Sequence, residues 1–283
     1  MPGAVVIGLM LGLFFEYWGL IAALIACGLF SGFAAGLFGI GGGAVIVPVL
    51  IILFDSLGYT DTASHVAIAT SLATIILTST RSVLAHHRRG AVDWMIIRHW
   101  GAWIMLGAIL GQIVAGLMSN AGLKLLFSVM ALVLAAQLYF GRPDWRLAAD
   151  VPRGGRGAIL AGMVGGLSAI IGIGGGTFGV TMLTLFGRSM HQAVATAAGF
   201  GVAIGLPSAL TAISIGWGRE GLPPFSLGYV NVAAFALISA FTVITAPLGA
   251  RLAHRLDAIR LKKLFAILLA LVAIRLMSGF IGG

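Results

Sequence analysis

The sequence contains few charged residues and a single cysteine. Asp, Glu, Lys and Arg make up 9% of its 283 residues, whereas 60% of the residues are hydrophobic. A soluble domain carries roughly 25% charged residues, so this chain lacks the polar groups needed to cover a globule in water. Cys27 alone cannot form a disulfide framework or a thiolate metal cluster. The composition therefore predicts a polytopic membrane protein.

Motifs of catalysis and of nucleic-acid binding are also missing. The sequence has no P-loop, no nucleophile elbow, no paired catalytic carboxylates and no His-x-x-x-His zinc pattern. The net charge of +9 comes from short runs of Lys and Arg between apolar segments, not from a basic stripe. We therefore expect no enzymatic activity, no cofactor, no bound metal and no nucleic-acid partner.

Acidic residues are absent from the middle of the predicted spans. All eight lie in loops or at span ends. Cation transporters and carboxylate-based proton pumps keep Asp or Glu inside the membrane, where such costly residues persist for function. Their absence favours an anionic substrate.

The chain consists of two copies of one unit. The run Gly39-Ile-Gly-Gly-Gly43 returns unchanged at 172–176, and the stretch that begins at His65 (HVAIATS) resembles the one at His191 (HQAVATA). The stretches that begin at Leu123 and Leu261 also match. We predict an N-terminal apolar extension over 1–19, a first repeat over 20–140, a cytoplasmic linker over 141–156 and a second repeat over 157–283.

Each repeat is predicted to be a glycine-broken helix followed by three transmembrane helices. The apolar run 43–54 after the first break would rise only about 18 Å as a helix, which is too short to cross a bilayer alone. The broken element is therefore a hairpin that either crosses fully or re-enters on the same side. With about 20 residues for each span, the all-α chain has about 8 to 10 membrane segments.

The distribution of Lys and Arg indicates that the two repeats are inverted. The basic loops are 81–99 in the first copy and 251–263 in the second, which are not equivalent positions. If each repeat crosses an odd number of times, nearly all of these charges fall on one side, as the positive-inside rule requires. Both termini then lie outside the cytoplasm. Inverted repeats around interrupted helices are typical of alternating-access transporters.

The two glycine breaks are the candidate substrate site. Irregular backbone persists at membrane depth only where it is buried in protein or lines a watery cavity. The helix after each break presents N–H groups and a positive dipole end, which suit an anion; alternatively, the glycines serve only close helix packing. The candidate binding residues are the glycines and nearby hydroxyls: Gly39, Gly41, Gly42, Gly43, Thr70, Ser71, Gly172, Gly174, Gly175, Gly176, Thr177 and Thr196.

Three basic residues are candidates for proton coupling or gating. His65 and His191 open equivalent helices, and histidine is the side chain type suited to carry a proton near neutral pH, although a histidine that merely caps a helix is the alternative. Arg81 ends a span, where it either draws anions to the entrance or reaches lipid headgroups. The hydroxyls of Thr70 and its neighbours likewise either donate to an oxyanion or bond back to their own helix.

Several stretches resemble the TauE/SafE sulfite exporter family over roughly residues 20–280. In the first half these are GLFGIGGGAVIVPVL, HVAIATSL and RRGAVDW, and in the second IGIGGGTFGV, HQAVATAAGF and LPPFSLGYVN. The resemblance implies an inner-membrane permease for small sulfur-containing anions, without fixing which one. The family's motif residues fall on the two glycine runs, Thr70, Ser71 and Thr196. Ala197 stands where Ser71 stands in the first copy, which departs from a symmetric pair of serine contacts.

The resulting hypothesis is a secondary transporter that binds sulfite, thiosulfate, sulfoacetate or another organosulfonate between the repeats and exports it. An interior-negative potential favours export by about 2.3 kcal/mol per charge and 100 mV. The alternatives are an anion channel, a proton-coupled uptake permease for another small organic anion, and a membrane scaffold or sensor without flux. The expected partners are the anion, the lipid bilayer and, for uptake, protons; the sequence does not fix the oligomeric state.

Overall fold

The fold is taken from a computed structural model, which describes residues 2–38, 41–141, 146–148, 150–252 and 258–281. These residues form ten α-helices and one two-stranded hairpin, which confirms the predicted all-α polytopic class. The first half contains α1 (Pro2–Phe38), α2 (Gly43–Ser56), α3 (Ala63–His87), α4 (Trp94–Leu117) and α5 (Asn120–Phe140). The second half contains α6 (Gly154–Ile171), α7 (Gly175–Leu185), α8 (Met190–Ile215), strands β1 (Ser226–Leu227) and β2 (Val230–Asn231), α9 (Val232–Leu252) and α10 (Ala258–Ile281).

Helix length separates spanning elements from half-spanning ones. Among the described residues, seven helices are long and apolar enough to cross a membrane. The two helices that follow the glycine breaks, α2 and α7, have only 14 and 11 residues. Because a helix rises about 1.5 Å per residue, neither crosses a hydrocarbon core of about 30 Å alone. The short helix predicted after each break is therefore present.

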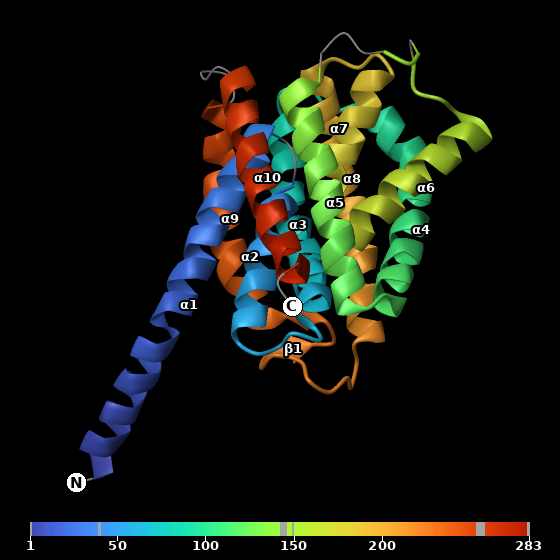
Figure 1. Ribbon diagram of the computed structural model, residues 1–283. Helices are drawn as coiled ribbons and strands as arrows, with labels where there is room; N and C mark the ends of the chain where they lie inside the picture. The colour runs from blue at the N-terminus through green and yellow to red at the C-terminus, as the bar shows by residue number, and fades with distance from the viewer. Residues whose placement is uncertain (1, 39–40, 142–145, 149, 253–257, 282–283) are drawn as a thin grey trace.

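The N-terminal extension is continuous with the first span. Its described residues belong to α1, which runs unbroken from Pro2 to Phe38. In Figure 1 the first half of α1, in dark blue, projects away from the bundle that the other helices form. Residues 2–19 are thus the beginning of a long helix and not a separate one.

The helices of the two halves interlock in a regular pattern. α1 packs along α9 and α4 along α6, while α3 packs along α8 and α5 along α10. If α1 to α5 are matched in order with α6 to α10, exchanging the halves reproduces this set of pairs. In Figure 1, α1 rises toward its break and α6 descends toward its own. Each half therefore packs mainly on the other one.

Glycines allow these helix pairs to approach closely. A Cβ atom on Gly107 or Gly111 of α4 would overlap the backbone of α6. In α1, a Cβ atom on Gly32 would overlap Thr242 of α9. Small residues at such crossings let helices associate in lipid, where no hydrophobic force drives them together. Glycines thus allow close packing in both the α1–α9 and the α4–α6 pair.

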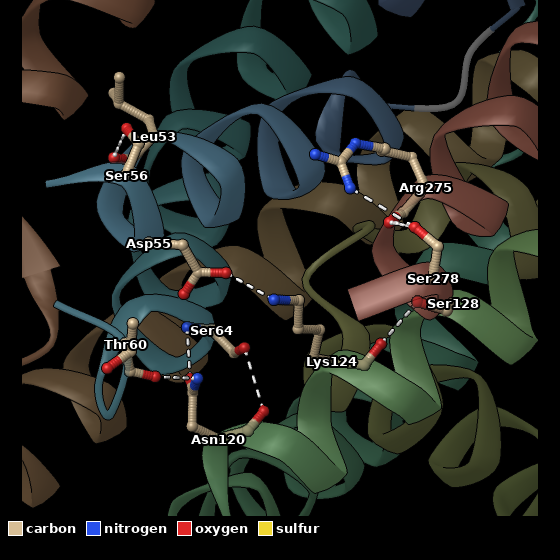
Figure 2. A network of polar contacts seen from close by, with 10 residues as sticks. All are labelled: Leu53, Asp55, Ser56, Thr60, Ser64, Asn120, Lys124, Ser128, Arg275 and Ser278. Carbon is tan, nitrogen blue, oxygen red and sulfur yellow. Dashed lines mark hydrogen bonds and ion pairs between the residues drawn. The ribbon is translucent and has the colours of Figure 1, made fainter. Parts of the chain in front are cut away.

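Ion pairs lie at both ends of the bundle. We call the end with residues 57–62, 118–119 and 216–231 the hairpin end, and the end with residues 88–93, 150–153 and 186–189 the basic end (Figure 1). At the basic end, Arg188 Nη2 lies 2.9 Å from Asp150 Oδ1 and 3.5 Å from Asp93 Oδ2. At the hairpin end, Lys124 Nζ lies 2.5 Å from Asp55 Oδ2 (Figure 2). Ion pairs thus join neighbouring segments at both ends.

Candidate functional site

Each glycine break contains residues in the left-handed backbone region. Gly41 and Gly42 have φ values of 77° and 78°, and Gly172 and Gly174 have values of 70° and 69°. A residue with a Cβ atom rarely adopts this conformation, so these positions require glycine. Gly39, also predicted to contact substrate, lies outside the described residues.

The two glycine breaks contact each other. A Cβ atom on Gly43 would overlap the carbonyl oxygen of Gly172 and lie 2.8 Å from the Cα atom of Ile173. The Ser71 hydroxyl on α3 donates a 2.8 Å hydrogen bond to the same carbonyl oxygen of Gly172. The structure thus brings together two breaks that lie in different halves of the chain.

A small cavity lies between the breaks, α1, α3 and α8. Glycines of both breaks, alanines and three hydroxyl residues line it: Ala35, Gly41, Thr78, Ser79, Ser82, Gly176, Ala197 and Ala198. Its volume is about 10 Å³, which is room for about one water molecule. No charged side chain belongs to the described part of this lining. The described lining offers hydroxyl groups and backbone to a ligand but no counter-charge for a cation.

Thr70 and Thr196 join the halves instead of lining this cavity. The Thr70 hydroxyl accepts a 2.9 Å hydrogen bond from the backbone N–H of Asn231, and the Thr196 hydroxyl accepts one of 3.0 Å from Asp93. The Asn231 and Asp93 side chains in turn accept hydrogen bonds from the first turns of α9 and α4. Each half therefore supports the N-terminus of a helix in the other half, an arrangement that differs from both sequence-based interpretations of these hydroxyls.

The remaining predicted glycines lie in tight packing. Gly174 lies against Ile75, and a Cβ atom on Gly175 would come within 2.6 Å of the Cβ of Phe200. A Cβ atom on Gly42 would lie 3.1 Å from a carbonyl oxygen of α1. Some of these glycines thus pack helices closely, whereas those at positions 41 and 176 line the cavity, and their contact with a substrate stays a prediction.

Thr177 directly follows the cavity-lining Gly176. Its side chain is buried, and its hydroxyl has no hydrogen-bond partner among the described residues. A buried polar group left without a partner costs about 1–3 kcal/mol, so such an atom calls for a ligand or a water molecule. Of the predicted binding residues, Thr177 has the clearest unused hydrogen-bonding capacity.

The three candidates for coupling or gating do not share one site. His65 is buried near the hairpin end, at the start of α3, with its ring stacked 5.0 Å from that of Tyr229. His191 is exposed at the start of α8, near the basic end. Arg81 is exposed on α3 and does not belong to the cavity lining. The structure does not bring the two histidines into one relay.

Sequence reasoning missed several residues of this centre. Thr78 follows Thr70 by about two helical turns. The hydroxyls at positions 70, 74 and 78 recur every fourth residue, and this spacing places them on one face of α3. Asp93 and Asn231 each follow a left-handed glycine by three positions, which also marks them as equivalent. This common spacing is visible in the sequence. In the second half, however, the loop that carries the β hairpin separates Asn231 from α8.

Known proteins resemble this chain over both breaks. The family described as sulfite exporter TauE/SafE matches residues 24–276. This chain belongs to the TauE/SafE family. A probable membrane transporter protein of Haemophilus influenzae is 33% identical over 250 residues, which cover 88% of this chain and 95% of the relative. A probable membrane transporter protein of Methanocaldococcus jannaschii is 28% identical over 276 residues, covering 92% and 96%.

Membership of the TauE/SafE family confirms the resemblance seen in the sequence. A third relative, the probable membrane transporter protein YunE of Bacillus subtilis, is 30% identical over 193 residues, or 61% of this chain and 71% of the relative. No solved structure matches the chain. The family, its relatives and the apolar helices together establish a multi-pass membrane transporter.

Proposed function

We propose that the protein is a secondary transporter that exports small sulfur-containing oxyanions, such as sulfite, thiosulfate, sulfoacetate or other organosulfonates, across the cell inner membrane. The observation that carries this proposal is the meeting of two glycine breaks at a cavity lined by hydroxyl residues. α2 and α7 begin at these breaks, and the N-terminus of a helix carries partial positive charge. An oxyanion finds hydrogen-bond donors there, whereas a cation finds no carboxylate.

Candidate contacts follow from the geometry of the cavity. The Thr177 hydroxyl is buried and unpaired, and Thr78 and Ser79 line the cavity on the opposite helix, α3. Gly41 and Gly176 let a ligand approach the backbone closely, because no side chain intervenes. Ser71 holds the second break in place through the Gly172 carbonyl.

Alternating access between two inverted repeats is the proposed mechanism. The interchangeable helix pairs and the opposite directions of α1 and α6 support it (Figure 1). With room for about one water molecule, the cavity must widen before it holds sulfite. We place the basic end in the cytoplasm by the positive-inside rule, which puts both termini outside. The membrane potential then favours outward movement of an anion.

Flux measurements in proteoliposomes test the proposal. Radiolabelled sulfite, thiosulfate and sulfoacetate are offered with a membrane potential and a pH gradient imposed separately. Wild-type protein is compared with Gly43→Ala, which forces the breaks apart, and with Gly101→Ala on α4, where a Cβ atom meets nothing within 4 Å. Size-exclusion chromatography verifies that each variant is folded.

We expect saturable flux that unlabelled anion on the opposite side stimulates, and that Gly43→Ala abolishes while Gly101→Ala preserves it. Flux without saturation or trans-stimulation would establish a channel instead. Flux that requires an inward proton gradient would establish uptake. Absence of flux with all three sulfur anions would refute the proposed substrate class.

A further inference from the structure

The hairpin end holds a second, larger cavity that is separate from the one between the breaks. Its volume is about 570 Å³, and its wall comes from the end of α2, the 57–62 turn, the start of α3, the α4–α5 connection with the start of α5, and the loop after α8. The charged or strongly polar members of the wall are Asp55, Asp61, His65, Asn120, Lys124 and Arg219. We call this space the outer vestibule.

One side of the outer vestibule is a fixed hydrogen-bonded network (Figure 2). Lys124 pairs with Asp55 at 2.5 Å. The Asn120 side-chain oxygen accepts a 2.7 Å hydrogen bond from the Ser64 backbone N–H, and its amide donates to the Thr60 carbonyl oxygen. These groups are satisfied within the protein, so they shape the vestibule but leave little hydrogen-bonding capacity for a ligand.

His65, on another side of the vestibule, has unused hydrogen-bonding capacity. Its side chain is 6% exposed, and neither ring nitrogen has a hydrogen-bond partner among the described residues, although the backbone of Ala115 and Met118 lies beside the ring. Stacking on Tyr229, with ring centroids 5.0 Å apart and planes 22° from parallel, fixes the ring orientation. A buried ring N–H without an acceptor is costly unless a ligand or water completes it.

Arg219 places an unpaired cation next to this histidine. Its guanidinium carbon lies 5.9 Å from the centroid of the Tyr229 ring, and among the described residues it makes no ion pair. Of the other charges in the wall, Lys124 and Asp55 neutralise each other, and Asp61 is exposed, as is Arg219 itself. Among the described residues of the wall, Arg219 is thus the cation that takes part in no ion pair, and it lies on the side of His65 and Tyr229.

We infer that His65 and Arg219 form an outer docking site for the transported oxyanion, distinct from the site between the breaks. A guanidinium presents parallel N–H groups that match two oxygens of an oxyanion, and the His65 ring supplies a further donor. The identity of the ligand rests on the proposed function. The docking site would receive the anion on the hairpin side of each transport cycle.

Binding to purified protein in detergent tests this site without relying on transport. The variants are Arg219→Gln, His65→Phe, which keeps a ring to stack on Tyr229, and Arg98→Gln as a matched loss of an exposed arginine near the basic end. Sulfite and thiosulfate are titrated by calorimetry and by thermal shift. We expect Arg219→Gln and His65→Phe each to weaken binding about tenfold or more, the loss typical of one hydrogen bond to a charged group. Arg98→Gln retains wild-type affinity.

Stability without anion separates docking from a structural role. Because His65→Phe removes two unpaired buried nitrogens and keeps the ring contact, its melting temperature without anion should equal or exceed that of the wild type. A lower melting temperature with unchanged anion affinity would overturn the inference, as would absence of binding to the wild type.

Transport from each side completes the test. With protein of one orientation in the proteoliposome, Arg219→Gln should raise the KM for anion on the hairpin side and leave the KM on the basic side unchanged. An unchanged KM on both sides would refute the docking site while the proposed function stands. Loss of binding in Arg219→Gln without flux in the wild type would retain the docking site and refute the transport proposal.

Discussion

Replacing Ser71 with alanine tests the hydrogen bond that holds the second glycine break against α3. The Ser71 hydroxyl and the Gly172 carbonyl oxygen lie 2.8 Å apart in a fully buried position. Gly172 caps the C-terminus of α6, where the last carbonyls lack partners within their own helix. The alanine variant therefore leaves this carbonyl without its side-chain partner.

The size of the effect follows from two reference values. An unpaired buried carbonyl costs about 1–3 kcal/mol in soluble proteins, while hydrogen bonds between membrane helices contribute about 0.6 kcal/mol on average. We expect Ser71→Ala to lower the free energy of unfolding by about 1 kcal/mol. Because the second break also loses its position relative to α3, we expect anion flux to fall about tenfold or more.

Unfolding in mixed micelles and flux in proteoliposomes measure the two effects. Ser128→Ala is the matched control, since its hydroxyl donates a 2.7 Å hydrogen bond to the Lys124 carbonyl within α5 and joins no second element. We expect this control to change the free energy of unfolding by less than about 0.5 kcal/mol and to retain flux. Equal stability and equal flux in the two variants would refute the idea that the Ser71 bond positions the break.

Three other variants test contacts outside the cavity. Gly111→Leu should prevent α4 from packing on α6 and abolish recovery of folded protein, whereas Gly101→Leu should not; equal yields on size-exclusion chromatography would contradict this. Thr196→Val leaves the Asp93 backbone N–H unpaired and should lower the free energy of unfolding by about 1–2 kcal/mol. An unchanged unfolding curve in mixed micelles would argue against this contact between the halves. Lys124→Gln breaks a partly exposed ion pair and should lower the free energy of unfolding by less than about 1 kcal/mol, an effect that shrinks in high salt. A loss of stability that does not depend on salt would count against the ion pair as its cause.

The long apolar runs and the glycine breaks were predictable because composition and repetition alone determine them. The spans of α3, α4 and α5 follow from apolar length, and the breaks follow from an exact repeat of five residues. The β1–β2 hairpin was missed because strands of two residues show no periodicity.

The directions of individual side chains were less predictable than the elements that carry them. The sequence places hydroxyls at positions 70 and 71 of one helix, but neighbouring helical residues point about 100° apart. Ser71 therefore reaches the second break, while Thr70 faces the start of α9. Which residues face the cavity depends on the rotation of α3 about its axis, which only packing against α8 and α9 fixes.

The reciprocal hydrogen bonds from Asn231 to Thr70 and from Asp93 to Thr196 bear on how the protein is made. When the ribosome has completed α1 to α5, the Thr70 hydroxyl still lacks the N–H group that donates to it, because Asn231 has not been synthesised. The first half therefore lies in the bilayer without this contact until α9 is inserted. Neither half should reach its final fold alone. Two half-chains produced separately should regain a stable fold only when they meet in the same membrane.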